Sequence, residues 1–204
     1  MALKTIVKVG NISNLSDARY CAGMGVDMLG FNFKAGDPEA ISINDYKGIA
    51  EWLSGVRFVG EFQDSSIDII RDISDQLQFD AIEIDNPEIC RELAVDGIPI
   101  VLKFDPHDPQ GQIRTVMEYC AGSVEYFLIV VNESVSDEVK KTISALANDF
   151  PVLLGGNLSA DLVLNLIDTL PVQGIALKGS KEIKPGFKDY DELADILESL
   201  EIDD

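Results

Sequence analysis

The feature that most constrains the fold of this chain is an alternation of short apolar runs with amphipathic segments along its whole length. A β-branched or apolar run, a polar interruption and a segment of helical periodicity recur about every 25 residues. This pattern predicts strands that alternate with helices, and therefore a parallel sheet. The predicted strands are Thr5–Val9, Met28–Phe31, Arg57–Glu61, Ala81–Ile84, Pro99–Lys103, Tyr126–Val130, Val152–Leu154 and Gly174–Leu177. The predicted helices are Leu15–Met24, Ile43–Trp52, Ile67–Gln76, Pro87–Val95, Gln110–Tyr119, Asp137–Asn148, Ala160–Thr169 and Tyr190–Leu200.

Local signals mark several of the predicted helix ends. Serines stand at four N-cap positions, where a side-chain oxygen accepts a hydrogen bond from the first turn: Ser42, Ser66, Ser136 and Ser159. Glycines follow four of the helices as C-terminal stops: Gly25, Gly55, Gly97 and Gly122.

Eight strand–helix units are compatible with two architectures. An open doubly wound sheet normally has fewer units and a recognisable dinucleotide-binding turn. Eight units in 204 residues fit a compact (β/α)8 barrel, in which the chemistry lies where strands end and loops lead into helices. We therefore predict an α/β protein with a single (β/α)8 TIM-barrel domain over residues 1–204, ending in a short acidic, solvated tail at Glu201–Asp204.

The composition excludes several classes of partner. The chain has 36 Asp+Glu against 16 Lys+Arg, a formal net charge of −20, which disfavours nucleic acid and anionic membrane surfaces. No apolar run is long enough to span a membrane and the first residues do not read as a signal peptide, so we expect a cytoplasmic protein. The acidic helix faces at 64–75 and 192–201 are either solvated surface or a docking face for a protein partner.

The residues that commonly hold metals are few and scattered. Cys21, Cys90 and Cys120 are too widely spaced for a disulfide framework or a metal motif, and each falls in or directly after a predicted helix, so we predict buried thiols. The lone His107 lies in the turn-like segment Asp105–Pro109. We therefore expect neither a metal site nor a cofactor.

Glycines follow the last two predicted strands. Gly155 and Gly156 end the first of them, and Gly179 follows the second. A glycine at the end of a strand lets backbone amides approach an anion without a Cβ in the way, and a strand, glycine and helix start often hold phosphate. The sequence therefore predicts a phosphate site here, with the alternative that these glycines only serve the turns.

Charged residues are predicted to face the barrel interior or its rim. Strand alternation places Lys8, Glu83, Asp85 and Lys103 there, and on weaker grounds Asn32, Glu61 and Lys178. Glu83 and Lys103 lie on neighbouring strands, close enough to pair. One interpretation is a buried ion pair that adds little stability. The other is a polar pocket in which a desolvated lysine acts as a base or Schiff-base nucleophile, with Lys103 as our first choice.

Several motifs carry a resemblance to a known family. The chain opens with Lys8-Val-Gly-Asn-Ile-Ser-Asn-Leu-Ser-Asp-Ala18 and Gly25-Val-Asp-Met-Leu-Gly-Phe31, and later contains Leu154-Gly-Gly-Asn-Leu158 and Pro185-Gly-Phe-Lys-Asp189. These segments resemble K-I-C-G-I-T-N-L-x-D-A, G-A-D-x-L-G-F, A-G-G-L and P-G-x-K-D of phosphoribosylanthranilate isomerase. The resemblance spans nearly the whole chain and implies the same barrel fold.

The residues that do the family's chemistry differ in this sequence. The family isomerises an aminoaldose to an aminoketose, with the cysteine of K-I-C-G as general base and an aspartate at the end of strand six as general acid. These positions align with Gly10 and Val130. The arginine of S-P-R-Y, which pairs with the anthranilate carboxylate, aligns with Glu39, and Q-L-H-G has become Glu83-Ile-Asp-Asn86. Each acid or base contributes about 10²–10⁴-fold in rate, so we predict that the ordinary isomerisation is lost.

The resemblance also bears on the remaining site residues. Gly155 and Gly156 match glycines whose amides bind the substrate phosphate in the family, and S-S-G has become Lys178-Gly179-Ser180, which adds a positive charge. The family also has a lysine on strand five, at the position that Lys103 occupies in this chain.

Three functions follow as hypotheses. The first is an isomerase-like barrel that binds a phosphorylated small molecule without the family's acid–base pair. The second is a working phosphoribosylanthranilate isomerase or related sugar-phosphate isomerase, an intramolecular oxidoreductase that uses Asp85, Glu61, Glu83 or Lys103 instead. The third is a catalytically silent barrel that binds a metabolite or a partner protein.

Overall fold

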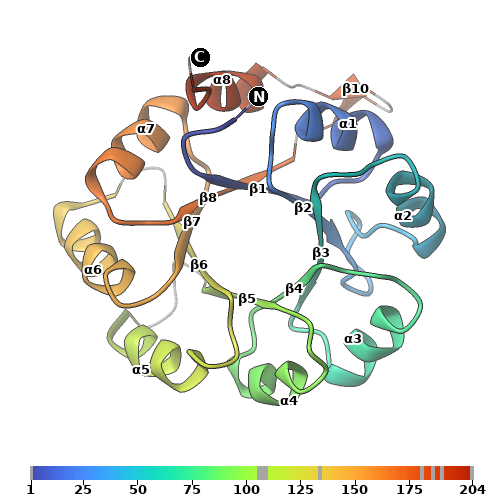
Figure 1. The fold of residues 1–204 in the computed structure, drawn as a ribbon, viewed down its shortest axis with the longest axis horizontal. Helices are drawn as coiled ribbons and strands as arrows, with labels where there is room; N and C mark the ends of the chain where they lie inside the picture. Colours follow the sequence, from blue (N-terminus) through green and yellow to red (C-terminus); the bar gives the residue numbers. More distant parts are fainter. Residues whose placement is uncertain are drawn as a thin grey trace.

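The chain folds into a closed barrel of eight parallel strands surrounded by helices (Figure 1). The structure is a computed structural model that describes residues 2–104, 110–132, 135–179, 182–184, 187–188 and 191–202. Each strand pairs with the next in chain order, and β8 pairs with β1. The barrel strands are β1 Ile6–Gly10, β2 Met28–Asn32, β3 Arg57–Gln63, β4 Ala81–Ile84, β5 Ile100–Phe104, β6 Tyr126–Val131, β7 Val152–Gly156 and β8 Gly174–Lys178. The helices are α1 Leu15–Gly23, α2 Ile43–Ala50, α3 Ile67–Ser74, α4 Cys90–Ala94, α5 Gln110–Cys120, α6 Asp137–Ala147, α7 Ala160–Thr169 and α8 Asp191–Ser199.

The predicted (β/α)8 barrel is confirmed, and most predicted element ends differ by one or two residues from those observed. The fourth helical segment is divided: a 3-10 turn, η1 (Pro87–Ile89), precedes the short helix α4. A small antiparallel pair, β9 (Glu182–Lys184) and β10 (Phe187–Lys188), follows β8 and was not predicted. His107 lies outside the described residues.

The predicted helix signals hold in most cases. Ser42, Ser136 and Ser159 each accept a hydrogen bond from a backbone amide three residues on, whereas Ser66 occupies the N-cap position without such a bond. Gly25, Gly55 and Gly97 have φ values of 82°, 82° and 79°, a left-handed conformation that glycine adopts without strain.

Two apolar layers build the molecule. The larger one lies between the strands and the helices, and it includes all three cysteines, which are buried as predicted. The smaller one fills the barrel interior with seven side chains: Met28, Val59, Ala81, Val101, Leu128, Leu153 and Ala176. Glu61, Glu83 and Lys103 each lie two residues further along their strands than the inner-layer residue, and Lys8 lies two residues after Ile6, which packs against that layer. The charged residues therefore occupy the end of the barrel at which the strands finish.

The two ends of the chain meet where the barrel closes. All five residues of β1 are in register with β8, from Ile6 opposite Gly174 to Gly10 opposite Lys178. Leu3 forms an antiparallel bridge with Glu201, and the Ile202 amide donates a hydrogen bond to the Ala2 carbonyl at 3.1 Å. We predicted a solvated tail from Glu201. Its first two residues pair with the start of the chain while Ile202 stays 51% exposed, and 203–204 lie outside the described residues. No helix in the described part of the chain is both long and apolar enough to cross a membrane.

Candidate functional site

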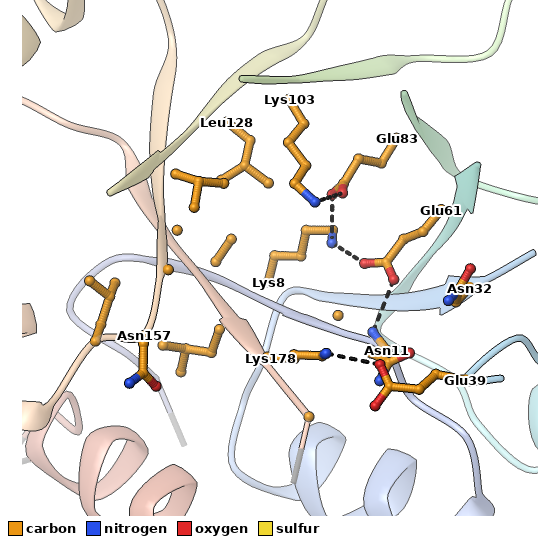
Figure 2. Close-up of a pocket in the computed structure, with 18 of the residues that line it drawn as sticks. Lys8, Asn11, Asn32, Glu39, Glu61, Glu83, Lys103, Leu128, Asn157 and Lys178 are labelled. Carbon is orange, nitrogen blue, oxygen red and sulfur yellow. Dashed lines mark hydrogen bonds and ion pairs between the residues drawn. The ribbon is translucent and has the colours of Figure 1, made fainter. Parts of the chain in front are cut away.

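A cavity of about 740 Å³ lies at the carboxyl ends of the barrel strands (Figure 2). It has two chemically different sides. The lining residues from β1 to β5 and their loops are polar or charged, apart from Gly10: Lys8, Asn11, Asn32, Asp37, Glu39, Glu61, Gln63, Glu83 and Lys103. The lining residues from β6 to α8 are mainly apolar or glycine: Leu128, Val130, Gly155, Gly156, Leu158, Ala176, Leu177, Gly179, Leu193 and Ile196, with Asn157, Lys178 and Glu192 as the polar members. No aromatic side chain lines the cavity among the residues that the structure describes.

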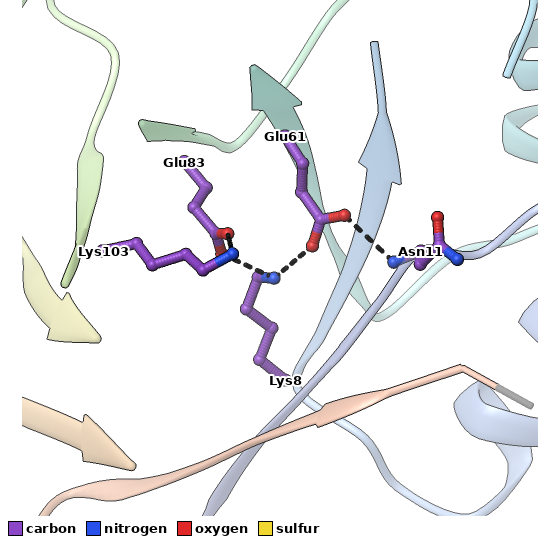
Figure 3. Close-up of polar contacts among 5 residues, drawn as sticks. All are labelled: Lys8, Asn11, Glu61, Glu83 and Lys103. Atoms are coloured by element: carbon purple, nitrogen blue, oxygen red, sulfur yellow. Dashed lines mark hydrogen bonds and ion pairs between the residues drawn. The ribbon is translucent and has the colours of Figure 1, made fainter. Parts of the chain in front are cut away.

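Four charged side chains form the deepest polar group, which we call the floor cluster: Lys8, Glu61, Glu83 and Lys103 (Figure 3). Lys8 Nζ is in close contact with Glu61 Oε1 and lies 2.7 Å from Glu83 Oε2. Lys103 Nζ lies 4.0 Å from Glu83 Oε1, too far for a hydrogen bond. The cluster contains two positive and two negative side chains and is therefore neutral in sum.

Lys8 is the best enclosed member of the floor cluster. Its side chain is 3% exposed, and those of Glu61 and Glu83 are 11% and 6% exposed. Burial alone would lower the pKa of the Lys8 ammonium, but the charges of Glu61 and Glu83 outweigh it and the pKa is raised. Lys8 is therefore a permanent cation at neutral pH, and it is an unsuitable proton acceptor.

Two glycines make room for the Glu61 carboxylate. Gly10 on β1 and Gly30 on β2 both lie beneath it, and a Cβ on either residue would overlap Glu61 Oε1. A Cβ on Gly10 would also come within 3.2 Å of Lys8 Nζ. The other carboxylate oxygen, Glu61 Oε2, accepts a hydrogen bond from the backbone amide of Asn11 at 3.0 Å. The space beside Gly10, where another residue would place a side chain, is thus filled by a carboxylate from β3.

The glycines of the predicted phosphate site line the cavity, but each also makes a close contact within the barrel that does not involve a ligand. Gly156 has a φ of 137°, and a Cβ there would overlap the Val131 carbonyl oxygen, so only glycine fits. A Cβ on Gly155 would lie 2.9 Å from a methyl group of Leu128. The Gly179 amide donates to the Gly10 carbonyl at 2.8 Å, which leaves it unavailable as a donor to an anion.

Lys178 is exposed at the rim of the cavity and is already paired. Its Nζ lies 2.9 Å from Glu39 Oε2, which belongs to the loop after β2. The two side chains are 59% and 52% exposed, so water screens this ion pair. The contact joins residues 139 positions apart and was not predicted, because neither sequence position carries a signal of its partner.

The remaining predicted site residues are divided between the cavity and its surroundings. Asn32 is buried in the lining and accepts a hydrogen bond from the Lys34 amide at 2.9 Å, and Val130 also lines the cavity. Asp85 is exposed and is not among the lining residues. Although Asp85 reaches solvent, desolvation by the surrounding protein and then the charge of Asp64 raise the pKa of its carboxyl. Ser180 lies outside the described residues.

No group of three or more His, Cys, Asp and Glu side chains is arranged to hold a metal ion in the described part of the chain. The chemistry available in the cavity is that of carboxylates, ammonium groups and backbone amides: hydrogen bonding, charge complementarity and proton transfer.

These features define a (β/α)8 barrel with a ligand-sized cavity at the catalytic end of the strands. A family model described as N-(5'-phosphoribosyl)anthranilate (PRA) isomerase matches residues 7–199. The chain belongs to this family.

The curated relatives agree over nearly their full length. N-(5'-phosphoribosyl)anthranilate isomerase from Maridesulfovibrio salexigens is 26% identical over 202 residues, which cover 94% of this chain and 96% of the relative. The enzyme of the same name from Gloeothece citriformis is 25% identical over 205 residues, with 95% and 93% covered.

Solved structures show the same fold. A monomeric form of the dimeric phosphoribosylanthranilate isomerase from Thermotoga maritima superposes with a TM-score of 0.78 at 23% identity, covering 96% of this chain and 98% of the other. A phosphoribosylanthranilate isomerase in complex with reduced 1-(o-carboxyphenylamino)-1-deoxyribulose 5-phosphate superposes with a TM-score of 0.75 at 23% identity and the same coverage.

Proposed function

We propose that this protein binds a phosphorylated small molecule at the mouth of its barrel and does not use the family's cysteine–aspartate pair. The observation that carries the proposal is the position of Glu61. Its carboxylate occupies the space beside Gly10, the residue that aligns with the family's cysteine, which supports a site that works without that cysteine. Val130, which aligns with the family's aspartate, offers no proton to the cavity it lines.

A phosphorylated ligand is supported by the cavity and by the family. The described lining residues enclose about 740 Å³, which favours a ligand-binding barrel over one filled by its own side chains. Gly155 and Gly156 lie at the end of β7, where the fold commonly binds phosphate. A structural neighbour of the family was solved with a 5-phosphate compound. Lys178 supplies a positive charge at the adjacent strand end.

The family's own substrate fits this cavity poorly. Glu39 stands at the position that aligns with the arginine pairing with the anthranilate carboxylate, and Asp37 lies beside it in the same lining. Lys178 partly neutralises Glu39, so a substrate carboxylate is disfavoured here by the charge of Asp37 and by the loss of the family's positive charge at this position. The protein is therefore proposed to bind a phosphorylated compound without a carboxylate at that end.

The direct test is an isomerisation assay with freshly prepared phosphoribosylanthranilate. We expect no turnover by the wild-type protein above the rate without protein, and no growth when it is expressed in a strain that lacks the isomerase. Robust turnover would contradict the proposal.

The ion pair between Glu39 and Lys178 gives a test of phosphate binding. An anion that uses Lys178 must compete with Glu39, so Glu39→Gln should free the ammonium group and strengthen binding of inorganic phosphate several-fold. Thermal shift at 1–50 mM phosphate, with chloride as the ionic-strength control, measures the effect. Glu125→Gln, which breaks an ion pair with Arg57 near the start of the strands, is the matched control and should leave phosphate binding unchanged. The absence of any phosphate-specific shift in all three proteins would contradict the phosphate site.

A further inference from the structure

The floor cluster contains more charged groups than a simple buried ion pair requires. Glu83 already gives Lys8 a counter-ion at 2.7 Å, yet a second carboxylate is brought against it from β3. That second carboxylate, Glu61, fits only because β1 and β2 carry glycine at the two positions beneath it. Burying further charge contributes little to stability on its own. The arrangement therefore points to a use for the Glu61 carboxylate.

Glu61 faces the cavity while its orientation is fixed from two sides. One oxygen contacts the Lys8 ammonium, and the other accepts a hydrogen bond from the backbone amide of Asn11. Each oxygen retains a second lone pair. Glu83 lies between the two lysines and serves as their counter-ion, so it is the less available of the two carboxylates. Glu61 is in register with Glu83 across β3 and β4, and it lies beside Gly10 and Asn11 in the cavity lining.

Lys103 is the more exposed cation of the floor cluster. Its side chain is 34% exposed, against 3% for Lys8, and the nearest carboxylate oxygen is 4.0 Å away. Its ammonium protons are therefore free for a ligand group that enters the cavity. Lys8 and Glu83 connect Lys103 to Glu61, as Figure 3 shows, so a proton acceptor and a proton donor border the same space.

We propose that Glu61 and Lys103 form a proton-transfer pair for a phosphorylated hydroxy-aldehyde or hydroxy-ketone, an inference that rests on the proposed binding of a phosphorylated ligand. The Glu61 carboxylate takes a proton from the carbon next to the carbonyl. The C–H electron pair forms the new C=C bond, the carbonyl π electrons move to oxygen, and the Lys103 ammonium gives that oxygen a proton. Glu61 then returns its proton to the former carbonyl carbon, and the neighbouring hydroxyl proton goes to Lys103. The net change is an aldose–ketose isomerisation without any other reactant.

This assignment gives each member of the floor cluster a separate role. Glu61 and Lys103 are the catalytic residues, whereas Lys8 and Glu83 are positioning residues that hold them. The absence of aromatic side chains from the described lining and its polar β1–β5 side suit a polyhydroxy chain. The lining beside β7 and β8 leaves the phosphate end of such a ligand near Gly155, Gly156 and Lys178.

The experiment measures deuterium exchange and binding in parallel. Glyceraldehyde 3-phosphate, dihydroxyacetone phosphate and ribose 5-phosphate are incubated with protein in D₂O, exchange next to the carbonyl is followed by proton NMR, and binding is followed by thermal shift. We expect the wild-type protein to accelerate exchange of at least one compound above the buffer rate. Glu61→Gln should reduce the exchange rate by about 10²–10⁴-fold while the ligand-induced thermal shift persists. Glu61→Asp should retain part of the rate.

Lys103→Met provides a second, independent variant, because this side chain is partly exposed and makes no close ion pair in the described structure. It should fold normally and also lose most of the exchange activity. Glu125→Gln is the control and should exchange at the wild-type rate.

The outcomes separate the two proposals. Binding without exchange by the wild-type protein, or wild-type exchange rates in Glu61→Gln or Lys103→Met, would overturn the proton-transfer pair and leave ligand binding intact. No thermal shift with any of the three compounds or with phosphate would overturn the binding proposal and this inference with it.

Discussion

At the scale of single residues, the barrel floor depends on how Lys8 is neutralised. Its ammonium is buried against two carboxylates, and no water-exposed alternative exists for a side chain that is 3% exposed. Removing one partner from a buried ion group costs far more than the group contributes intact, because the remaining charges are left without compensation.

Lys8→Met should therefore destabilise the protein by about 3–5 kcal/mol at neutral pH. Glu61 and Glu83 lose the Lys8 ammonium in this variant, and Lys103, 4.0 Å from Glu83, is the cation of the cluster that remains. The penalty comes from buried carboxylate charge without full compensation, so it should decrease as the pH falls and the carboxylates take up protons. Urea unfolding of the wild type and variant between pH 4.5 and 8 measures this, and the difference should shrink toward acid pH. Lys178→Met removes an exposed pair and should cost only about 0–1 kcal/mol at all these pH values; equal losses in the two variants would contradict the argument.

The sequence could predict part of this floor and not the rest. Strand alternation placed Lys8, Glu83 and Lys103 inward, because the side-chain period of two is a local property of the backbone. It could not show that Glu61 fills the space beside Gly10, since that depends on three strands meeting at one height. Asp85 shares the parity of Glu83, yet it follows the end of β4, where the alternation no longer applies and the side chain is exposed.

At the scale of elements, the seam between α4 and α5 carries buried thiols. Cys90 begins α4 and Cys120 ends α5, and both are buried. Burial is the main cause that raises the pKa of each thiol above its ordinary value. Cys120 Sγ also lies 3.7 Å from the Pro87 carbonyl oxygen in η1. The neutral thiol is thus the form that the folded protein tolerates.

The free energy of unfolding should therefore fall as the pH rises above about 9. The unfolded thiols lose their protons there while the folded ones keep them, so the unfolded state binds fewer protons and stability decreases with pH, by about 1.4 kcal/mol per pH unit for each fully ionising group. Denaturant unfolding at pH 8.0 to 10.3 measures the slope. Cys90→Ala should flatten the slope by the contribution of one group, although the substitution lowers the stability at pH 8. An unchanged slope in this variant would assign the alkaline instability to other groups.

The elements also show where local patterns were sufficient. The eight strands and eight helices follow from periodicity and cap residues, which act within a few neighbouring positions. The β9–β10 pair was missed because its strands have only three and two residues, too few for a periodic pattern. The Pro185-Gly186 dipeptide between them is a turn signal that could have indicated it.

At the scale of the whole molecule, eight units in one chain predicted closure, but not how the chain ends are joined. Closure requires β1 to lie beside β8, and the two backbones approach so closely that a Cβ on Gly174 would overlap the Ile6 carbonyl oxygen. Beyond the barrel, the Lys4 amide donates to the Leu200 carbonyl at 2.9 Å and the Ile202 amide donates to the Ala2 carbonyl at 3.1 Å. These contacts extend the closure from the strands to the segments outside them.

Ile202→Pro tests whether this terminal pairing contributes to the stability of the barrel. Proline removes the amide that donates to Ala2, and the loss of one hydrogen bond should cost about 0.5–1.5 kcal/mol. For a chain of this size that corresponds to a decrease in Tm of about 1–6 °C. Ile202→Val keeps the amide and nearly all of a side chain that is 51% exposed, so its Tm should stay close to that of the wild type. Because β1 begins at Ile6, only three residues after Leu3, hydrogen exchange of the β1 amides should also rise in the proline variant alone. Equal Tm values for the two variants would show that the barrel closes through β1 and β8 without help from the chain ends.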